Sequence, residues 1–360
     1  MKTIQVKITS NPYFIIVGNG ILKDIGQHIK ALKCGQDAVI ITNSAINKLY
    51  GGIVSKSLKA QGISSHVIEV ADGEKSKQFK VAIDVIQKIA QFDVYKKPFI
   101  IALGGGVVGD LSGFVASIYK RGIPYIQVPT TLLAQIDSAI GGKTAIDLPV
   151  GKNLVGAFYQ PRMVYSDVAV LKSLDQRQIL NGFSEAVKYG VICDVNLFSF
   201  LEKHYSKLLQ ADLKLLELVV AECSKIKAEV VALDEKETIG LRTILNFGHT
   251  VGHAVEAASK FGRYQHGEAV ALGMRAAAMI SLELKLVPKK DVVRLNQLLT
   301  DMGLPETIQN VQLSDIMSLM RRDKKFISGK NRLVLMRKIG KVEVIEAIPS
   351  HIIESALRQI

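Results

Sequence analysis

Short apolar runs rich in β-branched residues recur through the first half of the chain, and longer amphipathic stretches separate them. The runs predict strands at residues 14–17, 38–41, 66–70, 99–103 and 125–128. The stretches between them, such as residues 44–60 and 75–91, have helical spacing. Strand and helix alternation of this kind predicts βαβ units and a parallel sheet.

The second half has a different pattern. From about residue 173 to residue 286 it is helical, with alanine-rich stretches such as residues 269–282. Short strands at residues 332–336 and 341–345 predict a hairpin around Gly340, and a last helix follows Pro349. We therefore expect two domains, an α/β domain over residues 1–170 and a mostly α-helical domain over residues 171–360, with the active site in the cleft between them.

Composition narrows the class of protein. Hydrophobic residues make up 48% of the 360 residues and charged residues 22%, which excludes a disordered chain. The net charge of +13 favours anionic partners, but no polybasic run suggests nucleic acid. No apolar run is long enough to predict a membrane span. Three scattered cysteines and a strand-like N-terminus indicate a reducing compartment, the cytoplasm.

A glycine-rich segment, Gly104 to Asp110, follows the apolar run at residues 99–103 and precedes a helical stretch. Gly104, Gly106 and Gly109 fit the pattern G-x-G-x-x-G, which lets the backbone approach a pyrophosphate at a helix N-terminus. No acidic residue ends a strand about 20 residues later, so this is not the usual first fingerprint of a Rossmann fold. A tight glycine turn without a cofactor remains the alternative.

A second segment, Gly141 to Thr144, resembles the end of a P-loop. The position where a P-loop has its first glycine is Asp137, whose carboxylate would repel a triphosphate. The sequence therefore argues against a nucleoside triphosphatase.

Three of the seven histidines, His249, His253 and His266, gather near one another in the sequence. His249 and His253 are four residues apart, so they share a helix face, as metal-ligand pairs often do. A carboxylate such as that of Glu185 would complete a site suited to Zn²⁺. The alternatives are ordinary core or surface histidines, and an ordinary surface ion pair between Glu185 and Lys188.

Together these segments resemble the 3-dehydroquinate synthase family of the shikimate pathway, within the sugar phosphate cyclases. The run from Pro129 to Lys143 is the most specific match. The matching segments follow the family order over nearly the whole chain: residues 71–75, 104–110, 121–144, 151–158, 184–190, 227–231, 234–256, 266–274 and 323–325.

The resemblance implies a Rossmann-like NAD-binding N-terminal domain and a helical domain that binds metal and substrate. It implies a phosphate-eliminating carbon–oxygen lyase of chorismate and aromatic amino-acid biosynthesis. Such an enzyme converts 3-deoxy-D-arabino-heptulosonate 7-phosphate to 3-dehydroquinate and phosphate. Transient NAD-dependent oxidation, phosphate elimination, re-reduction and intramolecular aldol closure follow one another. NAD and Zn²⁺, or Co²⁺ in its place, are the implied cofactors.

The resemblance also implies site residues by position. The implied metal ligands are Glu185, His249 and His266. The implied substrate-binding and catalytic residues are Arg121, Asp137, Lys143, Asn153, Lys188, Lys227, Arg242, Asn246, His253 and Lys325, with Lys324 as the alternative to the last. The implied cofactor-binding residues are Thr42, Asn43, Glu74, Lys75, Gly105, Gly106, Val107, Asp110, Thr130, Thr131, Lys143 and Lys152.

Three of these assignments carry further implications. His253 would contact the substrate phosphate rather than the metal, in contrast to the spacing argument. Asp137 would lie at the junction of nicotinamide and substrate. Arg121 would reach the phosphate of a neighbouring subunit, which implies a homodimer. One departure from the family is Asp175, which stands where proline is frequent and is expected to change only a turn.

Three other functions stay open. Another sugar phosphate cyclase, making 2-deoxy-scyllo-inosose or a valiolone, would share the metal ligands and the glycine loop. A metal-dependent polyol dehydrogenase would produce NADH and would not need the segment from Asp137 to Lys143. A basic binding module without activity would not need all three metal ligands, which this chain retains.

Overall fold

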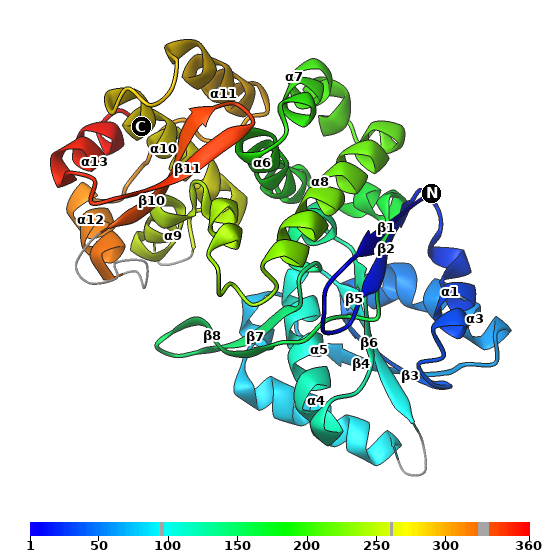
Figure 1. Ribbon diagram of the computed structural model, residues 1–360. Helices are drawn as coiled ribbons and strands as arrows, with labels where there is room; N and C mark the ends of the chain where they lie inside the picture. The colour runs from blue at the N-terminus through cyan, green and yellow to red at the C-terminus, as the bar shows by residue number, and fades with distance from the viewer. Residues whose placement is uncertain (94–96, 260–261, 323–330) are drawn as a thin grey trace. The chain divides into compact units, whose positions relative to one another are not determined.

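The computed structural model describes residues 1–93, 97–259, 262–322 and 331–360. The chain forms two compact units (Figure 1). Unit 1 comprises Met1–Leu174 and Leu216–Lys236, and unit 2 comprises Asp175–Leu215 and Glu237–Ile360. Residues 216–236 thus belong with the N-terminal unit, although they follow residue 170, where the sequence pattern placed the boundary.

The described part of unit 1 is built on a seven-stranded sheet. Its order is β1 (Lys2–Val6), β2 (Tyr13–Gly18), β9 (Met163–Asp167), β6 (Tyr125–Pro129), β5 (Pro98–Gly104), β3 (Asp37–Asn43) and β4 (Ser64–Val70). β1 pairs with β2 antiparallel, and the other neighbours are parallel. The parallel sheet and its five predicted strands are confirmed, whereas β9 was not predicted.

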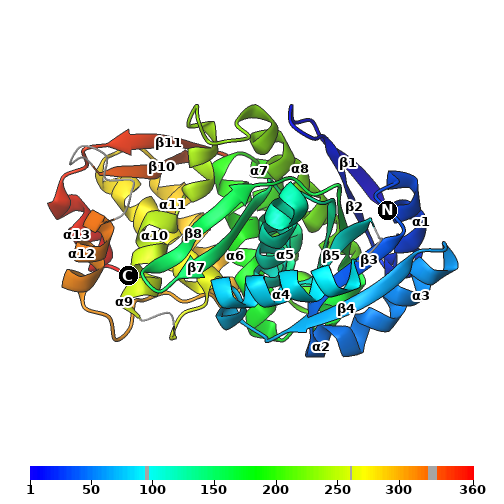
Figure 2. The same ribbon diagram turned by 90° about the horizontal axis from the view of Figure 1, so that it is seen from below.

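Helices cover both faces of this sheet. Figures 1 and 2 show α1 (Ile25–Leu32) and α3 (Gly52–Ala60) on one side, and α4 (Phe79–Phe92) and α5 (Gly106–Ile118) on the other. Val39 and Ile41 of β3 pack in one apolar cluster with α4 and α5, while Ala38 and Ile40 are buried on the opposite face. This burial on both faces explains why the central strands are continuous apolar runs.

The two long helices predicted in unit 1 are shorter than expected. The stretch from residue 44 to residue 60 divides into α2 (Ser44–Ile46), a π-helical turn η2 (Asn47–Gly51) and α3. The stretch predicted to start at residue 75 begins with a 3₁₀ turn, η3 (Glu74–Ser76), and α4 starts only at Phe79. Short turns η1 (Leu22–Asp24), η4 (Tyr119–Arg121) and η6 (Val168–Ser173) and a π-helical turn η5 (Ala134–Ser138) connect other elements.

The strand order places a topological switch beside β3. The chain runs from β3 to β4 on one side, and then returns to β5 on the other side of β3. Connections after β3 and β5 therefore leave toward opposite faces, and α/β sheets bind ligands at the carboxyl ends of the strands at such a switch point. The glycine loop follows β5 at this edge.

Unit 1 also contains a hairpin and a helix that the sequence pattern did not predict there. β7 (Lys143–Leu148) and β8 (Gly151–Phe158) form a separate antiparallel pair. Most of α8 (Leu213–Leu233) belongs to this unit, and Ser224 Oγ donates to the carbonyl of Gln135, 3.3 Å away. The segment around η5 is thereby held by a helix from much later in the chain.

Unit 2 is mostly helical, as predicted. It contains α6 (Gln176–Ile192), α7 (Val195–Leu209), a 3₁₀ turn η7 (Leu241–Asn246), α9 (His249–Ala258), α10 (His266–Glu283), α11 (Lys289–Asp301), α12 (Leu313–Arg322) and α13 (Ser350–Leu357). The predicted hairpin is present as β10 (Arg332–Lys338) and β11 (Lys341–Glu346). No helix in the described ranges is long and apolar enough to cross a membrane.

Helix α10 is the centre of unit 2, because α6, α9, α11, α13 and β10 all contact it. Its approach to α9 depends on glycine: a Cβ on Gly273 would lie 1.8 Å from the carbonyl oxygen of Gly248. Gly248 itself has φ +77° and immediately precedes His249, the first residue of α9. Asp175 caps α6 by accepting from the backbone N–H of Gln178 at 2.8 Å, so this departure from the family stabilises a helix start.

Candidate active site

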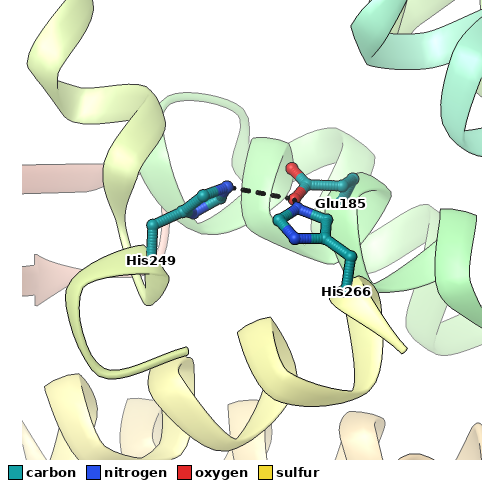
Figure 3. Close-up of side chains that lie close together, drawn as sticks. All are labelled: Glu185, His249 and His266. Atoms are coloured by element: carbon teal, nitrogen blue, oxygen red, sulfur yellow. Dashed lines mark ion pairs between the residues drawn. The ribbon is translucent and has the colours of Figure 1, made fainter. Parts of the chain in front are cut away.

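Unit 2 brings Glu185, His249 and His266 together from three helices. Glu185 lies within α6, and the two histidines are the first residues of α9 and α10. One donor atom from each lies within 4.8 Å of the others. Both Nε2 atoms are 3.4 Å from Oε1 of Glu185 (Figure 3). Two imidazoles and one carboxylate are a donor set typical of catalytic zinc, which keeps a fourth position open.

The Nδ1 atoms of His249 and His266 have partners on the far side of each ring. Nδ1 of His249 is 3.1 Å from the carbonyl oxygen of Phe247, and Nδ1 of His266 is 3.2 Å from Oε2 of Glu256. When Nδ1–H donates to these oxygens, Nε2 is the ring atom that faces Glu185, and it can bind a metal once it carries no proton. Sequence analysis missed Glu256, although it lies seven residues after His249 and therefore on the same face of α9.

The charges around Glu185 favour its ionised form. Its side chain is fully buried, and the ammonium of Lys188, only 1% exposed, pairs with it. Burial alone would raise the pKa of Glu185, but Lys188 and His249 outweigh burial and hold that pKa well below its usual range. The ammonium of Lys188 and the Nε2 atoms of His249 and His266 face its carboxylate oxygens. A buried, ionised carboxylate of this kind fits a bound cation.

The two histidines differ in charge. Burial lowers the pKa of His249 to about 4, so that its imidazole is neutral and able to bind a metal at neutral pH. Burial also acts to lower the pKa of His266, but hydrogen bonds to Glu185 and Glu256 raise it to about 9. The two carboxylates therefore favour the charged form of His266, and a divalent cation on Nε2 would take the place of its proton.

His253 does not share a donor set with His249. It is exposed one turn after His249, and their ring centroids are 5.3 Å apart at a steep angle. Within the described residues, His253 forms a second donor set with Glu256 and His266. Both histidines lie on α9, as their spacing predicts, and His266 of α10 belongs to both candidate donor sets.

The remaining predicted residues of unit 2 lie in η7 or outside the described ranges. Arg242 is 1% exposed, and its Nε is 3.6 Å from Oε1 of Glu237. Asn246 ends η7 and is half-buried. Lys324 and Lys325 lie outside the described residues.

The predicted cofactor residues of unit 1 gather at the carboxyl ends of three adjacent parallel strands. Thr42 and Asn43 end β3, Gly105 and Gly106 follow β5, and Thr130 and Thr131 follow β6. Val107 and Asp110 lie in the first turns of α5. This edge is short of space, since a Cβ on Gly106 would lie 2.9 Å from Oγ of Ser138. Glycine here leaves room for a ligand against the backbone and the N-terminus of α5.

Lys77 connects the predicted cofactor and substrate residues, although sequence analysis did not single it out. Its ammonium is 2.5 Å from Oδ2 of Asp110 and also donates to Oδ1 of Asn153. Its side chain is 5% exposed, whereas the predicted neighbour Lys75 is exposed. The one sequence signal was its spacing of three from Glu74, which places both on one side of a 3₁₀ turn.

The other predicted residues of unit 1 lie on several elements. Asp137 of η5 forms an ion pair with Lys227 of α8. Glu74 lies 3.9 Å from Lys152 of β8, and Lys143 is exposed at the start of β7. Arg121 is exposed in η4, where its φ of +64° follows the φ of +48° of Lys120. Two consecutive left-handed residues other than glycine are a strained turn of the kind found at functional sites.

Comparison with known proteins agrees with this architecture. Residues 67–181 match the family model "3-dehydroquinate synthase N-terminal", and residues 182–326 match "3-dehydroquinate synthase C-terminal". A 3-dehydroquinate synthase of Desulforamulus reducens is 44% identical over 360 residues, which is 100% of both chains.

Two solved structures are also similar. One is 2-deoxy-scyllo-inosose synthase with carbaglucose-6-phosphate, NAD⁺ and Co²⁺, with TM-score 0.88, 27% identity and 99% of each chain covered. The other is a 2-epi-5-epi-valiolone synthase of Streptomyces hygroscopicus with NAD⁺ and Zn²⁺, with TM-score 0.88, 24% identity and 98% of this chain and 97% of that chain covered.

The fold is that of the sugar phosphate cyclases, an α/β unit with a glycine loop joined to a helical unit. The chain belongs to the 3-dehydroquinate synthase family, and it is therefore an enzyme, a phosphate-eliminating cyclase. The family and the fold predicted from the sequence are confirmed.

Proposed function

We propose that the chain converts 3-deoxy-D-arabino-heptulosonate 7-phosphate to 3-dehydroquinate and phosphate, with NAD⁺ held by unit 1 and Zn²⁺ by unit 2. The observation that carries this proposal is the buried donor set of Glu185, His249 and His266, in a chain of this family. Bound NAD⁺ would accept and return a hydride, and Zn²⁺ would acidify the hydroxyl being oxidised. Co²⁺ suits the same donors.

The residues of unit 1 would bind the cofactor at the switch point of the sheet. The N–H groups at the start of α5 would receive the pyrophosphate, because the glycine loop keeps side chains away from that backbone. Thr42 and Asn43 would lie beside the adenosine ribose. Glu74, Lys75, Val107, Asp110, Thr130, Thr131, Lys143 and Lys152 would complete the cofactor site. Asp137 would lie where nicotinamide meets substrate.

A substrate with a carboxylate and a phosphate calls for several cations. In unit 2 these would be Lys188 and Arg242, with Asn246 on a hydroxyl and His253 on the phosphate. In unit 1 they would be Lys143 and Lys227, with Asn153. The buried guanidinium of Arg242 is the best placed of the group to bind an anion, since burial strengthens its charge interactions. Lys325 would contribute from the segment outside the described residues.

The proposed reaction has zero net redox, which distinguishes it from the alternatives. Incubation with 3-deoxy-D-arabino-heptulosonate 7-phosphate, NAD⁺ and Zn²⁺ is expected to release phosphate and dehydroquinate in equal amounts without accumulation of NADH. A chelator is expected to abolish release, and added Zn²⁺ to restore it. Phosphate release from glucose 6-phosphate instead would indicate another cyclase. Steady NADH production from a polyol would indicate a dehydrogenase.

We also propose a cytoplasmic homodimer in which Arg121 serves the partner's substrate phosphate. The support is the strained, exposed turn that presents Arg121, together with exposed apolar side chains on β8, where Leu154 is 41% and Phe158 45% exposed. The cysteine pattern supports the location.

Arg121→Ala is expected to raise KM for the phosphorylated substrate about 100-fold, since a charge-assisted contact contributes roughly 1.5–3 kcal/mol. Lys120→Ala is the matched control from the same turn. An unchanged KM in Arg121→Ala, or a monomer in sedimentation, would overturn this assignment.

A further inference from the structure

His266 stands at a vulnerable place for a metal ligand, the first residue of a helix. The first turn of a helix has backbone N–H groups without partners inside the helix and loses order easily. Its imidazole ring is oriented by Glu256, but that contact does not fix the backbone that carries the ring. Side chains from α6 meet this backbone directly.

One stripe of α6 faces the first turn of α10. Arg177, Asn181 and Glu185 follow one another at intervals of four residues and so share a helix face. Glu185 pairs with His266, as described above. Asn181 Oδ1 accepts the backbone N–H of Gly267, the residue after His266. The two helices touch here, because a Cβ on Gly267 would lie 2.2 Å from the carbonyl oxygen of Asn181.

Arg177 closes the other end of this contact. Its Nε and Nη2 donate to Oε1 and Oε2 of Glu268 at 2.7 and 2.8 Å, a bidentate pair. The same Nη2 donates to the carbonyl of Arg263 at 2.8 Å. Glu268 Oε2 also accepts the backbone N–H of Gln265 at 2.8 Å. The residues on both sides of His266 are thus tied to one guanidinium of α6.

We propose that Arg177, with Asn181 and Glu268, is a positioning clamp that sets the distance between His266 and Glu185 and so tunes metal affinity. The proposal rests on the proposed metal site. Arg177 is 49% exposed, so the pair contributes little to global stability, and its effect is geometric. The planar guanidinium of Arg177 binds both oxygens of Glu268, so it fixes the direction and the distance between the two side chains, which a single flexible contact does not.

Unit 2 offers a matched control. Arg294 of α11 forms the same bidentate pair with Glu202 of α7, at 3.0 and 2.6 Å, and is 40% exposed. It is an arginine–glutamate fork between two helices that carry none of the ligands. Removing either arginine should have a similar small effect on stability, but only Arg177 should affect the metal.

The test is titration of the chelated full-length chain with Co²⁺, followed by visible absorption, for Arg177→Gln, Arg177→Lys and Arg294→Gln. Arg177→Gln is expected to bind Co²⁺ about tenfold more weakly, the lower end of the range for groups that orient ligands. Arg177→Lys is expected to be intermediate, and Arg294→Gln to match the unchanged chain. Turnover of Arg177→Gln is expected to recover at saturating metal.

Equal Co²⁺ affinity in Arg177→Gln and the unchanged chain would overturn the clamp, and so would equal weakening in Arg294→Gln. Glu185→Gln separates this failure from that of the proposed function. If Glu185→Gln also leaves Co²⁺ binding unchanged, the donor set itself is wrong. If Glu185→Gln loses Co²⁺ while Arg177→Gln does not, the metal site stands without the clamp.

Discussion

His249→Ala is expected to lose its divalent cation and at least about a thousandfold in turnover. Its imidazole is one of the three donors proposed for the metal, and its Nε2 lies 3.4 Å from Oε1 of Glu185. A metal that stabilises developing charge contributes several kcal/mol, and each 1.36 kcal/mol is a factor of ten in rate. Because alanine leaves the carbonyl of Phe247 free to take water, the fold should persist.

The measurement combines phosphate release with metal content after gel filtration. His351→Ala is the control, because His351 is an exposed histidine in α13 of the same unit. It should keep both metal and activity. Near-normal turnover in His249→Ala, with metal still bound, would remove His249 from the ligand set. Loss of metal with full activity would show that turnover does not require the ion.

The sequence predicted those parts of the fold whose signal is local. Strands β3 and β5 are buried on both faces and read as unbroken apolar runs. β9 was missed because Tyr165, Ser166 and Asp167 interrupt its apolar pattern, although all are buried. The β7–β8 hairpin was missed because β8 is mostly exposed and contains two glycines, Gly151 and Gly156. Neither β9 nor β8 has the alternation of apolar and polar residues from which a half-buried strand is predicted.

The placement of residues 216–236 in unit 1 had no local signal. Helix α8 looks like any amphipathic helix of the second half, and its partners are distant residues such as Gln135. Which of two cores a helix joins is decided by long-range packing, which periodicity does not report.

For the site, local pattern singled out the glycine loop, the three clustered histidines and Glu185, but it did not indicate which donors come together. The spacing of four between His249 and His253 identified the helix and not the ligand, because the choice depends on where α6 and α10 present their side chains. The pattern alone offered Glu185 only as a candidate, since a glutamate three residues before a lysine is common on helix surfaces. Neither the local pattern nor the family resemblance identified Lys77 and Arg177, because the partners of both cations lie far along the chain.

Lys77→Met is expected to reduce the free energy of unfolding by about 3 kcal/mol, the lower end for breaking a buried ion pair, since Asp110 keeps 20% exposure. It should also weaken NAD⁺ binding, because Lys77 holds Asp110 at the start of α5 and Asn153 on β8. Lys88→Met is the matched control: Lys88 pairs with Asp84 on the surface of α4, at 46% and 55% exposure, and should cost under about 0.5 kcal/mol.

The pH dependence of unfolding stability tests the role of Lys77 independently. Burial raises the pKa of Asp110 above its model-peptide value of 3.8, and Lys77 opposes that rise. Without Lys77 the pKa rises further, so the folded variant binds more protons than the unfolded chain over a wider range. The contribution of Asp110 to stability in urea unfolding should therefore be fully present below pH 3.8 and be lost, as the pH rises, over a wider range than in the unchanged chain. Parallel pH profiles for Lys77→Met and Lys88→Met would show that Lys77 is not the partner that keeps Asp110 ionised.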